Sequence, residues 1–272
     1  MKSKEKLMRK FDEGKHICVG LDTDVNKIPP HLKDRDDALL EFNRIVIENT
    51  IDGAAAYKLN LAFYEQYGLE GLELMKKTLA LIPDDILTIG DAKRGDIGNT
   101  SSMYAKAIFD ELNFDAITLH PYMGFDSVEP FLEYQDKLHF VLALTSNKSA
   151  ADFEKLKLES GKYLYQQVIE KVNDWNSKGN CGIVFGATQL EELKNNIESF
   201  GDLVVLLPGI GAQGGSLEDV VTAFSDKNNL NYLINVSRGI IYCDMTLNFG
   251  DKVKSVLENY NTIINKLIST NS

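Results

Sequence analysis

The chain has 272 residues, of which 44% are hydrophobic and 25% charged, and its formal net charge is -11 at pH 7. This composition predicts a soluble globular protein with enough apolar material for a large core. The negative charge argues against nucleic acid or an anionic membrane as the main partner, because both attract positive surfaces. An anionic small molecule remains compatible with it if a few cations gather locally.

The N-terminal stretch MKSKEKLMRKFDEGKH is basic but lacks the apolar segment of a secretory signal, and no apolar run approaches the length of a membrane span. We therefore expect a cytoplasmic protein. Cys18, Cys181 and Cys243 form no CxxC pair and have no histidine at metal-ligand spacing. They predict reduced thiols rather than a disulfide framework or a metal site.

Short apolar runs rich in β-formers alternate with longer amphipathic stretches along the whole chain. Helical patterns include 37–50 and 101–112, and the stretch 251–268 follows the last run. The expected strands, in chain order, are 17–22, 55–60, 87–93, 116–120, 140–145, 182–187, 203–209 and 232–237.

Eight strand-helix units in a chain of this length predict the α/β class and a single (β/α)8 TIM barrel spanning residues 1–272. A doubly wound open sheet shares the alternation, yet eight regular strands favour closure. No linker or shift of composition marks a domain boundary.

In such a barrel the active site lies at the carboxyl ends of the strands, so the polar residues that close each apolar run are the candidates. The same residues could instead cap helices or meet solvent. They are Asp22, Lys58, Asn60, Asp91, Lys93, His120, Thr145, Ser146, 209–215, Ser237 and Arg238.

The stretch TIGDAKRGDIGNT places Asp91 and Lys93 two residues apart on the third strand and Asp96 in the loop that follows. Residues two apart on a strand share a face, so both side chains should reach the barrel mouth. Two nearby carboxylates favour the charged form of Lys93, which predicts an ammonium that can donate a proton. A surface salt bridge is the plain alternative. The tripeptide 94–96 also matches an adhesion motif, which the expected cytoplasmic location disfavours.

The segment PGIGAQGGS satisfies G-x-G-x-x-G with Gly209, Gly211 and Gly214 between a strand and a helix. A dinucleotide site is weakly indicated, because the motif falls in the seventh unit and the next strand ends in Ser237-Arg238 instead of an acid. Loops after the seventh and eighth strands of barrels commonly bind phosphate. We expect a phosphate site here, with glycine-bearing turns of no such function as the alternative.

Together these motifs resemble the orotidine 5'-phosphate decarboxylase family, in particular its longer bacterial subgroup, known as type 2. The D-x-K-x-x-D core of DAKRGDI carries the resemblance, supported by GLDTD, YKLN, LTSN, PGIGAQGG and NVSRGI in the expected order. The resemblance implies conversion of orotidine 5'-monophosphate to UMP and carbon dioxide, the last step of de novo UMP synthesis, without metal or organic cofactor.

The resemblance also implies roles by position. Lys93 would protonate C6, Asp91 would lie near the substrate carboxylate, and Lys58 would hold the charge network. In the family the second aspartate of the motif reaches across a homodimer. The remaining implied roles are the ribose side for Asp22 and Asn60, the pyrimidine for Thr145 and Ser146, the phosphate for Gln213, Arg238 and Gly239, and completion of the partner's site for Asp96 and Thr100.

Two other functions stay open on the sequence. Magnesium-dependent sugar-phosphate decarboxylases and aldol-type synthases of the same barrel superfamily share the D-x-K-x-x-D motif, although the Arg-Gly-Asp-Ile continuation favours the orotidine enzyme. A barrel that binds a phosphate ligand without catalysis is the second alternative, although binding alone would not require the acid-lysine-acid set.

Overall fold

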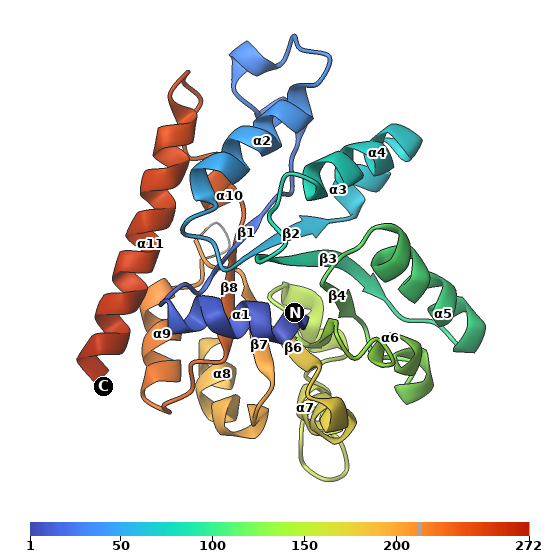
Figure 1. The fold of residues 1–272 in the computed structure, drawn as a ribbon. Helices are drawn as coiled ribbons and strands as arrows, with labels where there is room; N and C mark the ends of the chain where they lie inside the picture. The colour runs from blue at the N-terminus through green and yellow to red at the C-terminus, as the bar shows by residue number, and fades with distance from the viewer. Residues whose placement is uncertain (212–213, 272) are drawn as a thin grey trace.

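A computed structural model of the chain describes residues 1–211 and 214–271. Eight parallel strands pair in chain order and β8 returns to β1, which closes the barrel (Figure 1). The predicted (β/α)8 barrel is therefore confirmed, and the open doubly wound sheet is excluded. The strands are β1 (Ile17–Gly20), β2 (Ala56–Asn60), β3 (Leu87–Arg94), β4 (Ala116–Leu119), β5 (Leu138–Leu144), β6 (Cys181–Phe185), β7 (Val204–Pro208) and β8 (Tyr232–Val236).

Helices surround the barrel, and buried apolar side chains of this outer ring pack on the outward side chains of the strands. The α-helices are α1 (Ser3–Asp12), α2 (Ala38–Thr50), α3 (Ala62–Glu65), α4 (Gly68–Leu79), α5 (Gly98–Lys106), α6 (Glu129–Leu132), α7 (Leu164–Trp175), α8 (Leu190–Asn196), α9 (Leu217–Ser225), α10 (Arg238–Ile241) and α11 (Phe249–Asn271). None of the helices in this described part of the chain combines the length and apolarity needed to cross a bilayer.

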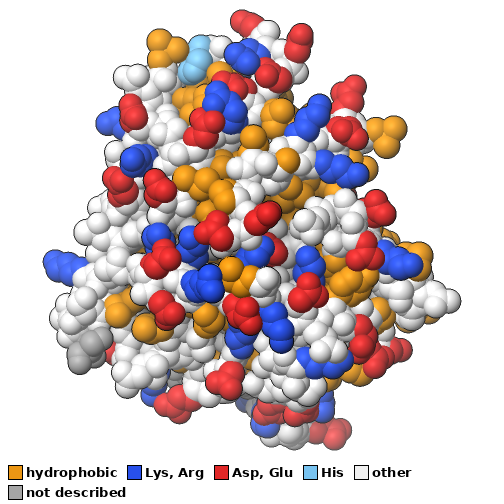
Figure 2. Space-filling view, in the orientation of Figure 1, with side chains coloured by type: hydrophobic (Ala, Val, Ile, Leu, Met, Phe, Trp, Pro, Cys, Tyr) orange, Lys and Arg blue, Asp and Glu red, His pale blue; other side chains and the backbone are white. Residues whose placement is uncertain are grey.

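Helix α1, which the sequence analysis did not predict, lies across the amino ends of the strands (Figure 1). Leu7 and Phe11, four residues apart on one face, pack with the inward side chains of the strands, among them Leu87 and Phe140. The helix therefore closes this end of the barrel, which we call the floor. Figure 2 looks onto this face and shows Lys and Arg side chains interspersed with Asp and Glu.

Candidate active site

Asp91, at the carboxyl end of β3, is the centre of a chain of four alternating charges at the barrel mouth. Its Oδ1 lies 2.7 Å from Lys93 Nζ and its Oδ2 lies 3.0 Å from Lys58 Nζ. Lys58 Nζ in turn lies 3.4 Å from Oδ1 of Asp22. The structure thus brings together the predicted residues of three neighbouring strands in the order Asp22, Lys58, Asp91, Lys93.

Burial divides this charge chain into a fixed part and an accessible end. The side chains of Lys58 and Asp91 are 5% and 11% exposed, whereas that of Lys93 is 50% exposed. Burial alone would raise the pKa of Asp91, but the ammonium groups of Lys58 and Lys93 outweigh it and hold the pKa below its ordinary value. Burial opposes the charge of Lys58 as well, yet Asp22 and Asp91 raise its pKa above the ordinary value. The result is a permanently charged buried pair that supports an exposed ammonium.

The backbone that carries Asp22 is held from two sides. Tyr64 donates its hydroxyl to the carbonyl of Leu21 at 3.0 Å, and Tyr242 donates its hydroxyl to the carbonyl of Asp22 at 3.2 Å. The same Tyr242 oxygen accepts the N–H of Asp24 at 2.7 Å. Because side chains from two different helical segments fix this loop, the Asp22 carboxylate has a defined position beside Lys58.

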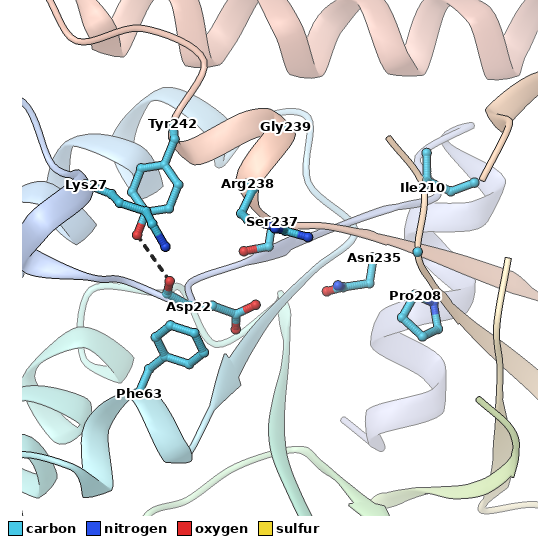
Figure 3. Close-up of a pocket in the computed structure, with 11 residues that line it drawn as sticks. Asp22, Lys27, Phe63, Pro208, Ile210, Asn235, Ser237, Arg238, Gly239 and Tyr242 are labelled. Carbon is cyan, nitrogen blue, oxygen red and sulfur yellow. Dashed lines mark hydrogen bonds between the residues drawn. The ribbon is translucent and has the colours of Figure 1, made fainter. Parts of the chain in front are cut away.

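A cavity of about 300 Å³ adjoins this charge chain on the side of β7 and β8 (Figure 3). Asp22 lines it together with Arg238 and Gly239, three residues that the sequence analysis assigned to the substrate. Among the ion pairs of the described residues, none involves Arg238, so its guanidinium is available to an anion. The cavity therefore extends from the Arg238 guanidinium to Asp22, the first member of the charge chain.

The glycine segment after β7 forms a tight turn at the edge of this cavity. Gly211 donates its N–H to the carbonyl of Gly215 at 3.2 Å, and Gly215 donates to the carbonyl of Gly209 at 3.0 Å. Gly209 and Gly211 have φ values of 109° and 73°, which side chains disfavour. The motif thus shapes a turn that a bulkier sequence could not form. Gln213, predicted to bind phosphate, lies outside the described residues.

Asp96 and Thr100 are not joined to the charge chain. The Asp96 carboxylate accepts the N–H of Ile97 at 2.8 Å, and the ion pairs within the described residues do not include it. Thr100 is exposed in the first turn of α5. Within the described residues, neither forms a hydrogen bond or an ion pair with Lys93 of its own chain.

The other predicted substrate residues lie at the ends of β2 and β5. Asn60 accepts the N–H of Ala62 at 3.2 Å through its side-chain oxygen, which places it at the start of α3. Thr145 donates its N–H to the carboxylate of Glu154 at 2.7 Å, and its hydroxyl lies within hydrogen-bond distance of the same carboxylate. Ser146 accepts the hydroxyl of Thr188 at its carbonyl, at 3.3 Å. These three residues do not line the 300 Å³ cavity.

Sequence reasoning missed several residues of the site. Lys27, Phe63, Asn235 and Tyr242 line the cavity with the expected residues (Figure 3). The Oδ1 atom of Asn235 is buried without a hydrogen-bond partner among the described residues. A polar residue inside the apolar run YLINV was the available signal for Asn235, whereas Lys27 and Phe63 lie in loops and helices that carry no such signal.

No cluster of three or more histidine, cysteine or carboxylate side chains with the spacing of a metal site occurs in residues 1–211 and 214–271.

Comparison with known proteins identifies the family. The model of the orotidine 5'-phosphate decarboxylase / HUMPS family matches residues 15–244. The chain belongs to this family. Curated relatives named orotidine 5'-phosphate decarboxylase include that of Porphyromonas gingivalis, 46% identical over 256 residues that cover 93% of this chain and 92% of the relative. The Dehalococcoides mccartyi protein of the same name is 45% identical over 97% of this chain and 98% of its own.

Solved structures of the orotidine 5'-phosphate decarboxylase family have the same fold. The Leishmania donovani OMP decarboxylase superposes with a TM-score of 0.82 at 36% identity, covering 97% of this chain and 99% of that one. The Leishmania donovani UMP synthase gives a TM-score of 0.83 at 39% identity and covers 95% of this chain but 56% of the synthase. The present barrel therefore corresponds to a part of that longer protein.

Proposed function

We propose that the protein is an orotidine-5'-phosphate decarboxylase, a carboxy-lyase that converts orotidine 5'-monophosphate to UMP and carbon dioxide in de novo pyrimidine synthesis. Family membership supports the reaction, and one structural observation carries the mechanism. A buried carboxylate, Asp91, bridges two ammonium groups and leaves one of them, Lys93, half-exposed. At the other end of the same charge chain, Asp22 lines a cavity with Arg238, which forms no ion pair among the described residues.

The chemical step needs a cation at C6 of the pyrimidine. When the bond from C6 to the carboxylate breaks, its electron pair remains on C6 in the ring plane, where the π-system cannot delocalise it. A fixed ammonium beside C6 stabilises this carbanion and transfers a proton to it, which forms the C6–H bond of UMP and leaves a neutral Lys93 amine. Solvent then returns the proton to the amine.

Asp91 holds the Lys93 donor in place, and Lys58 keeps Asp91 charged. The Asp91 carboxylate faces the position from which carbon dioxide departs, and two unit charges about 4 Å apart at an effective dielectric of about 20 repel by about 4 kcal/mol. Loss of the substrate carboxylate relieves this repulsion. Lys58 prevents Asp91 from becoming protonated, because its ammonium lies 3.0 Å from the carboxylate.

The phosphate binds at the opposite end of the cavity. Arg238 and Gly239 follow β8 directly, next to the turn formed by Gly209 and Gly211, and we assign Gln213 to the same group. Backbone N–H groups and one guanidinium suit a dianion. Since the phosphate is remote from the bond that breaks, its binding energy can position the ring and raise the rate.

The nucleoside lies between these two ends. We assign Asp22 and Asn60 to the ribose, since Asp22 lines the cavity between Arg238 and the charge chain. Thr145 and Ser146, at the end of β5, would contact the pyrimidine on the other side of Lys93.

We propose that the active form is a homodimer of single-domain barrels, residues 1–272, in which Asp96 and Thr100 complete the partner's site. Exposed apolar side chains are frequent in the segments that follow β3, β4 and β5, which include both residues, and exposed apolar surface marks protein interfaces. The exposed side chains include Ile97, Met103, Tyr104, Tyr122, Met123, Phe125 and Phe153.

Mixing two inactive variants tests this assembly. In a hybrid of Lys93→Ala and Asp96→Ala subunits, one site loses both groups and the other keeps both if Asp96 acts across the interface. Recovery of activity on mixing supports the shared site, whereas a mixture as inactive as its components contradicts it.

We further propose that the enzyme works in the cytoplasm without a metal or organic cofactor and without a nucleic-acid or membrane partner. The thiols of Cys18, Cys181 and Cys243 are free, which suits a reducing compartment. The Lys93 ammonium supplies the positive charge that a metal provides in related chemistry.

The decisive test follows the ultraviolet absorbance of orotidine 5'-monophosphate mixed with the purified protein, with and without a chelator. Loss of the substrate signal at the same rate in both samples supports the proposal. Activity that the chelator abolishes would favour a magnesium-dependent relative, and UMP binding without turnover would favour a binding protein.

A further inference from the structure

The pairing of β3 with β4 is interrupted where the charge chain begins. Gly90 pairs with Ile117 and Arg94 pairs with Leu119, so the segment 91–93 of β3 lies opposite Thr118 alone. Such a bulge changes the direction of side chains and is common beside active sites. Here it sets the positions of Asp91 and Lys93.

Thr118 fills the gap with its hydroxyl. It is 2% exposed, donates to Asp91 Oδ1 at 2.8 Å, and accepts the backbone N–H of Lys93 at 3.0 Å. A threonine hydroxyl can do both at once, since it has one hydrogen and two lone pairs. Because Asp91 Oδ1 also accepts from Lys93 Nζ at 2.7 Å, these bonds link the backbone of Lys93 to its own ammonium through Thr118 and Asp91.

Lys93 needs such support because its backbone is in an unfavourable conformation. Its φ is 47°, in the left-handed region that residues other than glycine seldom occupy. Asn113 and Asn228 also have positive φ, but asparagine tolerates this region better than lysine. A backbone held against its preference requires neighbours that fix it.

We propose that Thr118 is a positioning residue for the decarboxylation, which aims the Lys93 ammonium and the Asp91 carboxylate by bonding to both. The role rests on the proposed function of Lys93. Thr118 does not touch the substrate; it acts through the geometry of the two residues that do.

The floor of the barrel offers a matched control between the same two strands. Thr88 donates its hydroxyl to Oδ2 of Asp115 at 3.2 Å and accepts the N–H of Asp115 at 3.1 Å. Like Thr118, Thr88 uses its hydroxyl to donate to an aspartate carboxylate and to accept a backbone N–H. It lies at the amino end of β3, remote from the mouth. Thr88→Val therefore removes an equivalent pair of hydrogen bonds without disturbing Lys93.

The experiment compares the purified variants Thr118→Val, Thr118→Ser and Thr88→Val with the wild type in steady-state kinetics and ligand binding. Misplacement of a reacting group by about 1 Å costs about 10²-fold in rate, so Thr118→Val should lower kcat by about that factor with KM changed by less than about threefold. Thr118→Ser keeps the hydroxyl and should restore kcat. Thr88→Val should lose stability while kcat stays near that of the wild type.

A binding readout separates positioning from general loosening of the barrel. A uridine 5'-monophosphate analogue with an oxygen anion at C6 places negative charge where the carbanion forms, so its affinity depends on the aim of Lys93. Thr118→Val should weaken this analogue at least tenfold more than UMP, about the effect of losing one well-placed charge contact.

Equal kcat in Thr118→Val and the wild type, or equal loss in Thr118→Ser and Thr118→Val, would overturn the proposal. If Thr118→Val does not fold, Thr118→Ala removes the same hydroxyl without adding volume. A wild type that leaves orotidine 5'-monophosphate unchanged would contradict the proposed function alone. The crystal structure of the variant then decides the positioning role: an unchanged Lys93 backbone and Asp91 carboxylate would refute it.

Discussion

The floor and the mouth of the barrel hold a carboxylate between β3 and β4 in similar ways. At the floor, Asp115 is bonded by Thr88 and lies 2.7 Å from the ammonium of Lys6. At the mouth, Asp91 is bonded by Thr118 and lies between the ammonium groups of Lys58 and Lys93. At each end, therefore, one threonine hydroxyl and at least one lysine ammonium contact one aspartate carboxylate.

The difference lies in the number and the exposure of the cations. The floor has one ammonium for one carboxylate, and the Lys6 side chain is 12% exposed. At the mouth, Asp91 contacts two ammonium groups, and Asp22 contacts one of them, Lys58. The buried Lys58 keeps Asp91 charged, whereas the half-exposed Lys93 is accessible to a ligand. On the proposed mechanism, the neutral buried pair at the floor serves stability, and the additional accessible ammonium at the mouth serves the chemical step.

The largest effect should come from removing the charge of the carboxylate at each end. Asp91→Asn leaves Lys58 buried beside Asp22 alone and leaves Lys93 without its anchor, so turnover should fall by at least about 10³-fold. Asp115→Asn should destabilise the protein to urea without lowering kcat. Similar kcat losses in the two variants would contradict a catalytic role that is specific to the mouth.

An intermediate effect is expected for an arginine at each end. On the proposed phosphate role, Arg238→Ala removes a charge-assisted contact, so KM for orotidine 5'-monophosphate should rise by about 10²-fold. Arg9→Ala, on the exposed face of α1, should leave KM unchanged. A phosphate-free substrate, orotidine, provides the internal control, because its turnover should be insensitive to Arg238.

The smallest effect, counted per pH unit, concerns the pH dependence of stability and belongs to the floor. Burial lowers the pKa of His16 and of His139 to about 4, against an ordinary value of 6.5. Between pH 6.5 and 4 both histidines are protonated in the unfolded chain but remain neutral in the folded protein. The free energy of unfolding should therefore fall as the pH falls. The slope should reach about 1.4 kcal/mol per pH unit for each histidine.

Urea unfolding at several pH values measures this slope. His16→Gln should remove the contribution of one histidine to the slope and leave that of His139. The Asp91 carboxylate at the mouth should not titrate in this window. Asp91 has a pKa below its ordinary value of 3.8, so its contribution to stability is fully present above that value and is lost only at lower pH. An unchanged slope in both His16→Gln and His139→Gln would contradict the floor assignment.

The sequence predicted the barrel because each strand is a continuous apolar run, as expected for strands covered on both faces. All eight runs are strands, with ends that differ from the prediction by at most two residues. Helix α1 escaped prediction because its apolar face has only a few residues, including Leu7 and Phe11, in a sequence dominated by charges. The helix is buried only because it covers the open amino end of the barrel, and local sequence patterns do not reveal this tertiary contact.

The charge chain was predictable in composition but not in geometry. Asp91 and Lys93 were expected to meet by simple alternation along β3, yet their contact depends on the bulge and on the positive φ of Lys93. Thr118 looked like an ordinary strand residue in AITLH, because a threonine is common in strands. Its role is visible only when β4 is placed beside β3, because its two hydrogen bonds are to residues of that strand.

The central claim, that the Lys93 ammonium donates the proton at C6, is tested most directly by chemical rescue of Lys93→Ala. This variant should lose at least about 10³-fold in turnover of orotidine 5'-monophosphate while UMP binding persists. Because the Lys93 side chain is 50% exposed, a small amine can enter the space it leaves. Methylammonium should restore part of the rate, and tetramethylammonium, which carries the charge without a proton, should not. Turnover of Lys93→Ala close to that of the wild type, or equal acceleration by the two ions, would contradict the account.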